Sequence, residues 1–252
     1  MIALFLAAAI FAPPDANELI RAALAARKAQ NEHGWKFTYK EDYLQTDFDK
    51  NGKVEGKKLK TFDVIMLEGD NYRKLILIDG QPLDEKTQKK VDQDLEKARA
   101  ERHKHSTLRT LVRSWSVAGL EDLEGLFDNR VVGEETVRDR KAWRVESEPK
   151  KDHKPANKQE EQIMGARRTT WFDEAEGIEL KSDIEYLRPV EGMQPGSHDI
   201  TEFTKIGDAW LVDTIVMKVD FKALGLIHAR GESRYHYYDY KRFEVESKIT
   251  VQ

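Results

Sequence analysis

The stretch IELKSDIEY, residues 178–186, decides how this chain folds. Ile178, Leu180, Ile184 and Tyr186 alternate with polar or charged residues, so the apolar side chains fall on one side of an extended segment. This period of two is typical of a half-buried β-strand. The preceding turn, DEAEG, is short. A short turn joins antiparallel strands, because parallel strands need a longer crossover.

The same alternation recurs on both sides of this stretch. It predicts further strands at residues 35–43, 61–68, 72–79, 130–136, 140–148, 169–172, 199–206, 210–221 and 231–251. Most connections between them are short and rich in turn residues, as in KNGK at residues 50–53. The sheet is therefore expected to be antiparallel.

Helical periodicity is confined to the N-terminus and to one insert. A helix is predicted from residue 17 to 33, and the insert contains a highly charged helix at 84–105, an amphipathic helix at 108–115 and a shorter one at 120–127. The polar segment 149–161 is predicted to be a loop. We expect an α+β fold, in which the N-terminal helix and the insert cover the concave face of a strongly curved antiparallel sheet, a half-open barrel.

Composition excludes several kinds of chemistry. The chain has 252 residues, a formal net charge of -4 and no cysteine. This charge disfavours nucleic acid as a partner, because phosphate binding needs a basic face. The lack of cysteine excludes a disulfide framework, a thiol nucleophile and Cys-ligated zinc. The sequence has no GxSxG, HExxH or glycine-rich phosphate motif, so we expect no catalytic residues, no metal and no cofactor.

The N-terminus carries the candidate targeting segment. Residues 2–12 are an unbroken apolar run that ends at Pro13 and Pro14. The run is too short to span a bilayer, which needs about 20 residues, but it matches the core of a secretory signal. We predict a signal peptide at residues 1–16, one domain at 17–252, and an exported, periplasmic protein. A buried N-terminal helix is the alternative.

The aromatic residues indicate what the sheet could hold. Many fall at alternating positions of the predicted strands, where an ordinary core between sheet and helices would explain them. A sheet larger than its helices can cover would instead leave a concave apolar cavity for a ligand. The predicted cavity lining is Phe37, Tyr39, Met66, Leu75, Leu77, Trp143, Val145, Ile184, Tyr186, Ile215 and Met217, and the predicted lid is Leu108, Leu111, Val112 and Trp115. A slip of one residue would exchange the two faces of a strand.

Several local motifs, taken in order, resemble those of one family. They are WKFTYKED at 35–42, MLEG at 66–69, DGQPL at 79–83, GEET at 133–136, AWRVE at 142–146, WFD at 171–173 and YYDYKRF at 237–243. Together they resemble uncharacterised bacterial envelope proteins of the LolA-like outer-membrane lipoprotein-sorting superfamily. The resemblance implies a half-open antiparallel barrel closed by helices around a hydrophobic cavity. It also implies carriage of lipid or lipoprotein acyl chains, or envelope-stress sensing, as in a related regulator.

Three functions remain open at this point. The first is an exported, non-enzymatic, monomeric protein that binds an acyl chain, a lipid or a lipoprotein in the cavity. The second is a sensor or interaction module with a self-filled cavity, which would contact an envelope protein through residues 84–105 and 149–161. The third is an enzyme with an acid–base pair in a pocket. It requires a buried histidine or carboxylate that faces the cavity, and the predicted lining contains none.

Overall fold

The chain forms one sheet with four helices in the part that the structure describes. The structure is a computed structural model and describes residues 12–34, 36–49, 51–104, 119–223 and 227–243. The helices are α1 (Ala16–Glu32), α2 (Glu85–Lys104), α3 (Leu120–Leu126) and α4 (Lys158–Ile163). The strands are β1 (Lys36–Phe48), β2 (Val54–Leu67), β3 (Asp70–Ile78), β4 (Gln81–Pro82), β5 (Phe127–Val137), β6 (Arg140–Pro149), β7 (Ala166–Asp173), β8 (Glu179–Tyr186), β9 (His198–Ile206), β10 (Ala209–Ala223) and β11 (Ile227–Phe243).

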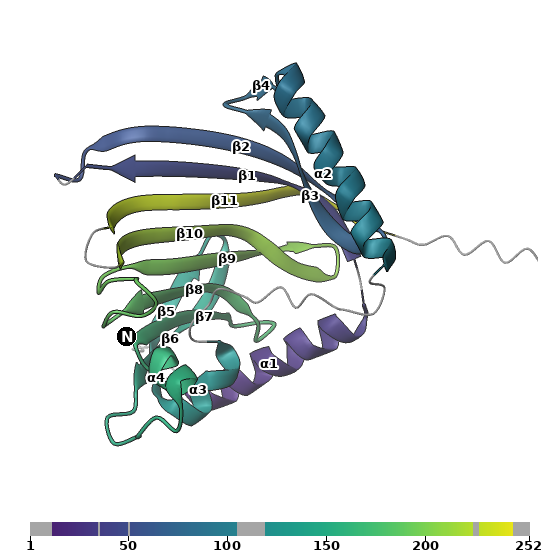
Figure 1. Ribbon diagram of the computed structural model, residues 1–252. Helices are drawn as coiled ribbons and strands as arrows, with labels where there is room; N and C mark the ends of the chain where they lie inside the picture. Colours follow the sequence, from purple (N-terminus) through teal and green to yellow (C-terminus); the bar gives the residue numbers. More distant parts are fainter. Residues whose placement is uncertain (1–11, 35, 50, 105–118, 224–226, 244–252) are drawn as a thin grey trace, which may run out of the picture.

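All 11 strands belong to a single antiparallel sheet. Its order is β4-β3-β2-β1-β11-β10-β9-β8-β7-β6-β5 (Figure 1). Two meanders, β1 to β4 and β5 to β11, are therefore joined where the first strand pairs with the last. The predicted α+β fold with a curved, unclosed antiparallel sheet is confirmed.

Local sequence explains where the elements begin and turn. The side chain of Asp15 accepts a hydrogen bond of 3.0 Å from the backbone N–H of Glu18 and so caps the start of α1. The turn from β2 to β3 places Glu68 and Gly69 at positive φ, 49° and 88°. Two successive left-handed residues are what a tight hairpin turn requires, and glycine adopts this conformation without strain.

The strand register defines two faces of the sheet, because paired residues on neighbouring strands point the same way. One row of partners crosses the sheet from β5 to β3. It consists of Val131, Val145, Thr170, Ser182, Thr201, Ile215, Tyr235, Tyr43, Lys60 and Ile78. We call the face that carries this row the inner face and the opposite one the outer face.

The hydrophobic core lies on the inner face at the β5 end of the sheet. Helices α1 and α3 pack together there, with α4 close by (Figure 1). The fully buried core residues come from these helices and from β5, β6 and β7: Ala16, Ile20, Ala23, Leu120, Leu123, Phe127, Val145, Ile163 and Phe172. The core therefore occupies one half of the inner face.

Helix α2 lies at the other end of the sheet, beside β3 (Figure 1). The guanidinium of Arg102 lies 5.7 Å from the ring centroid of Tyr72, and Lys74 is 3.8 Å from Asp92. Tyr72 and Lys74 flank Arg73, which pairs in register with Val64 on the inner face. The side chains of β3 that α2 contacts thus point to the outer face. Of the predicted insert, α3 is the part that packs on the inner face.

Some predicted boundaries differ from the observed ones. Strand β2 begins at Val54, well before residue 61, and the segment 149–161 contains the start of α4, where Asn157 caps the helix by accepting from the N–H of Glu160. Residues 1–11 of the predicted signal peptide and the predicted helix at 108–115 lie outside the described residues. No helix in the described ranges combines the length and the apolar character needed to cross a membrane.

Candidate ligand-binding face

One half of the inner face is filled by the protein's own side chains. The predicted lining residues Val145, Ile184 and Tyr186 lie in this half and are nearly inaccessible, at 0%, 2% and 3% exposure. Trp143 is half-buried, on the same face of β6 as Val145. Here the sheet, α1 and α3 form an ordinary core, as one of the two interpretations of the aromatic pattern predicted.

The other half of the inner face, over β1, β2, β3, β10 and β11, is only partly covered. Five half-buried residues of the predicted lining have their side chains here, namely Tyr39, Met66, Leu75, Ile215 and Met217. Phe37 joins them, because its ring lies 6.2 Å from that of Tyr240, which in turn is 5.0 Å from Tyr39. We call this region the open half.

Leu77 is the one predicted lining residue that the register places on the outer face. It pairs with Thr61, whose hydroxyl donates to the outer-face carboxylate of Asp42 at 2.7 Å. The cause is a β-bulge, since Leu75 pairs with Phe62 and leaves Ile76 unmatched. An extra residue in one strand reverses the alternation beyond it. The predicted lid residues Leu108, Leu111, Val112 and Trp115 lie outside the described residues.

Five tyrosines form the centre of the open half. We call Tyr39, Tyr43, Tyr235, Tyr237 and Tyr240 the tyrosine cluster. Ring centroids are 4.8 Å apart for Tyr43 and Tyr235 and 5.7 Å for Tyr39 and Tyr237, within the usual range of aromatic pairs. Burial is the main cause that raises the phenol pKa of Tyr237 and Tyr240 above 10. Burial also raises the phenol pKa of Tyr39 and Tyr235, so these four hydroxyls are neutral at physiological pH.

The site prediction missed four members of the tyrosine cluster. Tyr235 and Tyr237 obey the period of two, but Tyr240 is three residues beyond Tyr237 and still faces inward. Asp239, with φ 54°, and Tyr240 form a bulge opposite Tyr39. The signal in the sequence was the aromatic density of YYDYKRF, which alternation alone does not interpret.

A buried carboxylate lies in the middle of the tyrosine cluster. Glu41 is 5% exposed and accepts hydrogen bonds of 2.9 Å from Nε of Arg73 to each of its oxygens. The guanidinium carbon of Arg73 is 3.4 Å from the ring centroid of Phe62. Ion pairing and stacking together hold Arg73 against the sheet, and the pair neutralises its own charge.

The filled half contains a second buried charge network. Glu179, 7% exposed, binds Arg168 from β7 and lies 2.6 Å from a guanidinium nitrogen of Arg27 in α1. Nε of Arg168 also donates to the hydroxyl of Thr170 at 3.0 Å. This network links α1 to the inner face of the sheet. Removing Arg168 would be destabilising, because it would leave the buried carboxylate of Glu179 poorly compensated.

A third buried acid lies where the two halves meet. Asp199, 8% exposed, accepts a hydrogen bond of 3.0 Å from the Tyr186 hydroxyl, and its Oδ1 has no hydrogen-bond partner. Burial raises the pKa of Asp199 to about 6. The predicted lining contains no carboxylate, but two carboxylates outside that set, Glu41 and Asp199, face inward. Serine, threonine and charged residues interrupt the apolar alternation in these strands. The alternation therefore did not predict the inward-facing acids.

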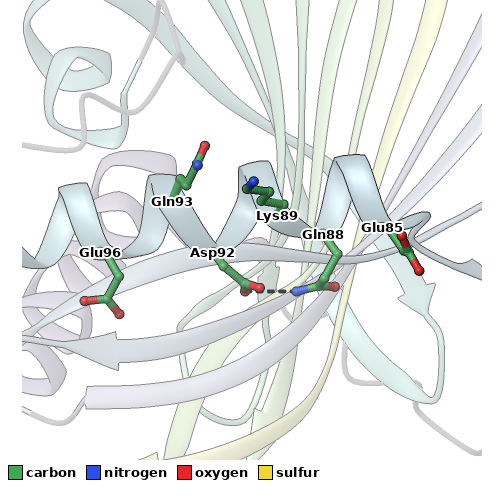
Figure 2. A pocket seen from close by; sticks show the side chains of 6 residues that line it. All are labelled: Glu85, Gln88, Lys89, Asp92, Gln93 and Glu96. Atoms are coloured by element: carbon green, nitrogen blue, oxygen red, sulfur yellow. Dashed lines mark hydrogen bonds between the residues drawn. The ribbon is translucent and has the colours of Figure 1, made fainter.

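Two hollows outside the inner face are open to solvent. The larger, of about 640 Å³, is lined by Glu85, Gln88, Lys89, Asp92, Gln93 and Glu96 (Figure 2). Within it the Gln88 amide donates to Asp92 at 2.9 Å. The smaller, of about 460 Å³, lies beside α1. Most of the residues that line these two hollows are polar or charged, but they present mainly the aliphatic parts of their side chains. Over the described ranges, no group of three or more acidic or histidine side chains could hold a metal ion.

Comparison with known proteins gives a likeness of fold. No family description and no curated protein matches the chain. It is similar to an outer membrane lipoprotein-sorting protein domain from Vibrio parahaemolyticus, with 11% identity, a TM-score of 0.40, and coverage of 94% of this chain and 95% of that one. For a LolA superfamily protein from Nitrosomonas europaea the values are 12%, 0.38, 95% and 99%.

A third solved structure is the MucA/MucB complex from Pseudomonas aeruginosa, with 11% identity, a TM-score of 0.29, and coverage of 89% of this chain and 94% of that one. At these identities no residue role passes from these structures to this chain.

Proposed function

We propose that this is an exported, non-enzymatic, monomeric protein that binds an acyl chain, a lipid or a lipoprotein on the open half of its inner face. The observation that carries the proposal is the part of the inner face that none of the described helices covers. There the tyrosine cluster and the aliphatic side chains of Leu75, Ile215 and Met217 stay half-buried, while the other half is filled by α1 and α3. An apolar ligand would remove this surface from water.

Burial alone supplies enough free energy for such binding. Each methylene group removed from water contributes about 0.8 kcal/mol. A chain of about ten methylenes therefore gains on the order of 8 kcal/mol before the costs of association. No covalent step and no metal is needed.

The filled half favours a second candidate. A sheet that already holds its own core at one end is compatible with an envelope sensor or protein-interaction module. Its contact surfaces would be the charged helix α2 and the polar segment 149–161. This candidate requires no ligand on the open half.

Native mass spectrometry separates the two candidates. The full chain would be purified from cells without detergent and extracted with organic solvent. The carrier predicts a co-purifying acyl species that Met217→Asp abolishes, because Met217 lies on the inner face. Leu77→Asp is the matched control, since Leu77 is half-buried on the outer face. A clean apo mass, without uptake of a fluorescent fatty acid, would refute the carrier.

A further inference from the structure

The open half changes character along the strands. At one end lie Phe37, Met66 and Tyr39, which are apolar or aromatic. Towards the hairpin between β1 and β2, the Tyr43 hydroxyl lies 3.1 Å from Oε1 of Gln45 and 3.3 Å from Oγ of Ser233. Apart from Arg242, whose guanidinium lies 6.0 Å from the Phe37 ring, and Asn71, the partner of Met66, the face therefore has an apolar end and a polar end, as a surface that orients an amphiphile requires.

Two lysines stand at the polar end without a counter-charge. Lys60 is half-buried between its register partners Tyr43 and Ile78, and Lys58 pairs with Gln45 one row further on. Neither ammonium group has an ion pair with a described residue, as judged within 4.0 Å. Lys58 is exposed, whereas Lys60 is partly buried. An unpaired charge that is partly buried is costly, and a ligand of opposite charge would relieve that cost at Lys60.

The acids on this face of the same strands are engaged elsewhere. Glu41 is bound by Arg73, and Asp47 accepts a hydrogen bond of 2.9 Å from the Gln45 amide. On the outer face two lysines have acidic partners, since Lys40 lies 3.3 Å from Asp239 and Lys181 lies 3.3 Å from Glu202. Lys58 and Lys60 thus place positive charge beside an apolar surface, in a chain of net charge -4.

We infer that the open half takes a single-chain amphiphile with an anionic head group. The head group lies against Lys58 and Lys60, and the chain lies along the tyrosine cluster towards Phe37. This inference rests on the proposed function and adds the class and the orientation of its ligand. The lysine ammonium groups and the head group attract each other while both remain partly exposed to water. This attraction discriminates between head groups but does not dominate the affinity.

Calorimetry with decanoate, decanol and decyltrimethylammonium tests the inference on the full chain. At pH 8 decanoate should bind on the order of fivefold more tightly than decanol, and decyltrimethylammonium more weakly than either. The double variant Lys58→Gln/Lys60→Gln should bind decanoate and decanol equally. The control Lys57→Gln should keep the preference, because Lys57 pairs with Thr46 on the outer face of the same strand.

The outcomes separate this inference from the proposed function. Equal binding of decanoate and decanol by the unmodified protein would overturn the head-group inference and leave the carrier function in place. A preference that survives in the double variant would overturn the role of the two lysines. Failure of all three probes to bind would refute the carrier function itself, and this inference with it.

Discussion

On the inner face, Asp199 is a buried acidic residue whose environment raises its pKa. Asp199 is buried, with Oδ1 unpartnered and Oδ2 accepting a hydrogen bond from the Tyr186 hydroxyl. Burial disfavours the charged form and raises the pKa of Asp199 from 3.8 to about 6. The folded state therefore holds this proton over a pH range in which the unfolded chain has lost it.

We expect Asp199→Asn to stabilise the protein at neutral pH. Because the folded pKa is the higher one, the free energy of unfolding falls as pH rises from about 4 to above 6, by on the order of 2–3 kcal/mol in all. The amide variant should lose that slope. Urea denaturation at pH 4, 5, 6, 7 and 8 measures it, with the exposed Asp152→Asn as control. Parallel pH profiles for the variant and the unmodified protein would contradict the assignment.

The sequence predicted the inward-facing side chains at most positions. The prediction failed at positions beside β-bulges. A period of two placed Tyr39, Ile215 and Met217 on the correct face because their strands are regular there. It failed for Leu77 and Tyr240, where bulges add one residue to the strand. A bulge depends on how two strands pair, so one strand's sequence does not reveal it.

Among the elements, α1 links local sequence to global stability. It contributes Ala16, Ile20 and Ala23 to the core, and it begins at the residue after its cap, Asp15. The predicted signal peptide ends at Ala16, inside this arrangement. A chain cut there would lose the cap and would place a new ammonium group at the positive end of the helix.

We expect Asp15→Ala to lower the free energy of unfolding by about 1 kcal/mol, the usual value of a helix cap. The same substitution at Asp152, which lies exposed in a turn, should change it by less than about 0.5 kcal/mol. Chemical denaturation measures both. A chain that begins at residue 17 should be destabilised at least as much as the Asp15→Ala variant. If the shortened chain is as stable as the unmodified chain, the cap is dispensable.

Most helices and the strands with clear apolar alternation were predictable, and a polar strand segment without that alternation was not. The strand predicted at 178–186 corresponds to β8, and the charged helix predicted at 84–105 corresponds to α2. The first half of β2, from Val54 to Lys60, was missed because EGKK at residues 55–58 offers no apolar alternation. These residues are held in the sheet by pairing with β1, which is a tertiary effect.

At the scale of the whole molecule, the packed core supports only part of the sheet. Strands β7 and β8 carry buried residues along most of their length, whereas β3 has none, and among the described strands only the two-residue β4 extends the edge of β3. Buried area, and with it the resistance to local opening, is thus unevenly distributed.

We expect amide hydrogen exchange to report this asymmetry. Amides of β7 and β8 should exchange only through global unfolding, whereas those of β2 and β3 should exchange through a lower-energy opening. Decanoate, if it binds the open half, should slow β2 and β3 selectively. Exchange measured by mass spectrometry on the full chain resolves these segments. Uniform protection across the sheet would contradict the expectation.

The pairing of β1 with β11 has a consequence for synthesis. Tyr43 and Ser233, which meet across this seam, are 190 residues apart in the chain. A ribosome therefore releases most of the protein before the strand that joins its two meanders exists. During that time β1 has only β2 beside it, and the sheet cannot be completed. The complete sheet, and with it the open half of the inner face, therefore forms only after β11 has been made.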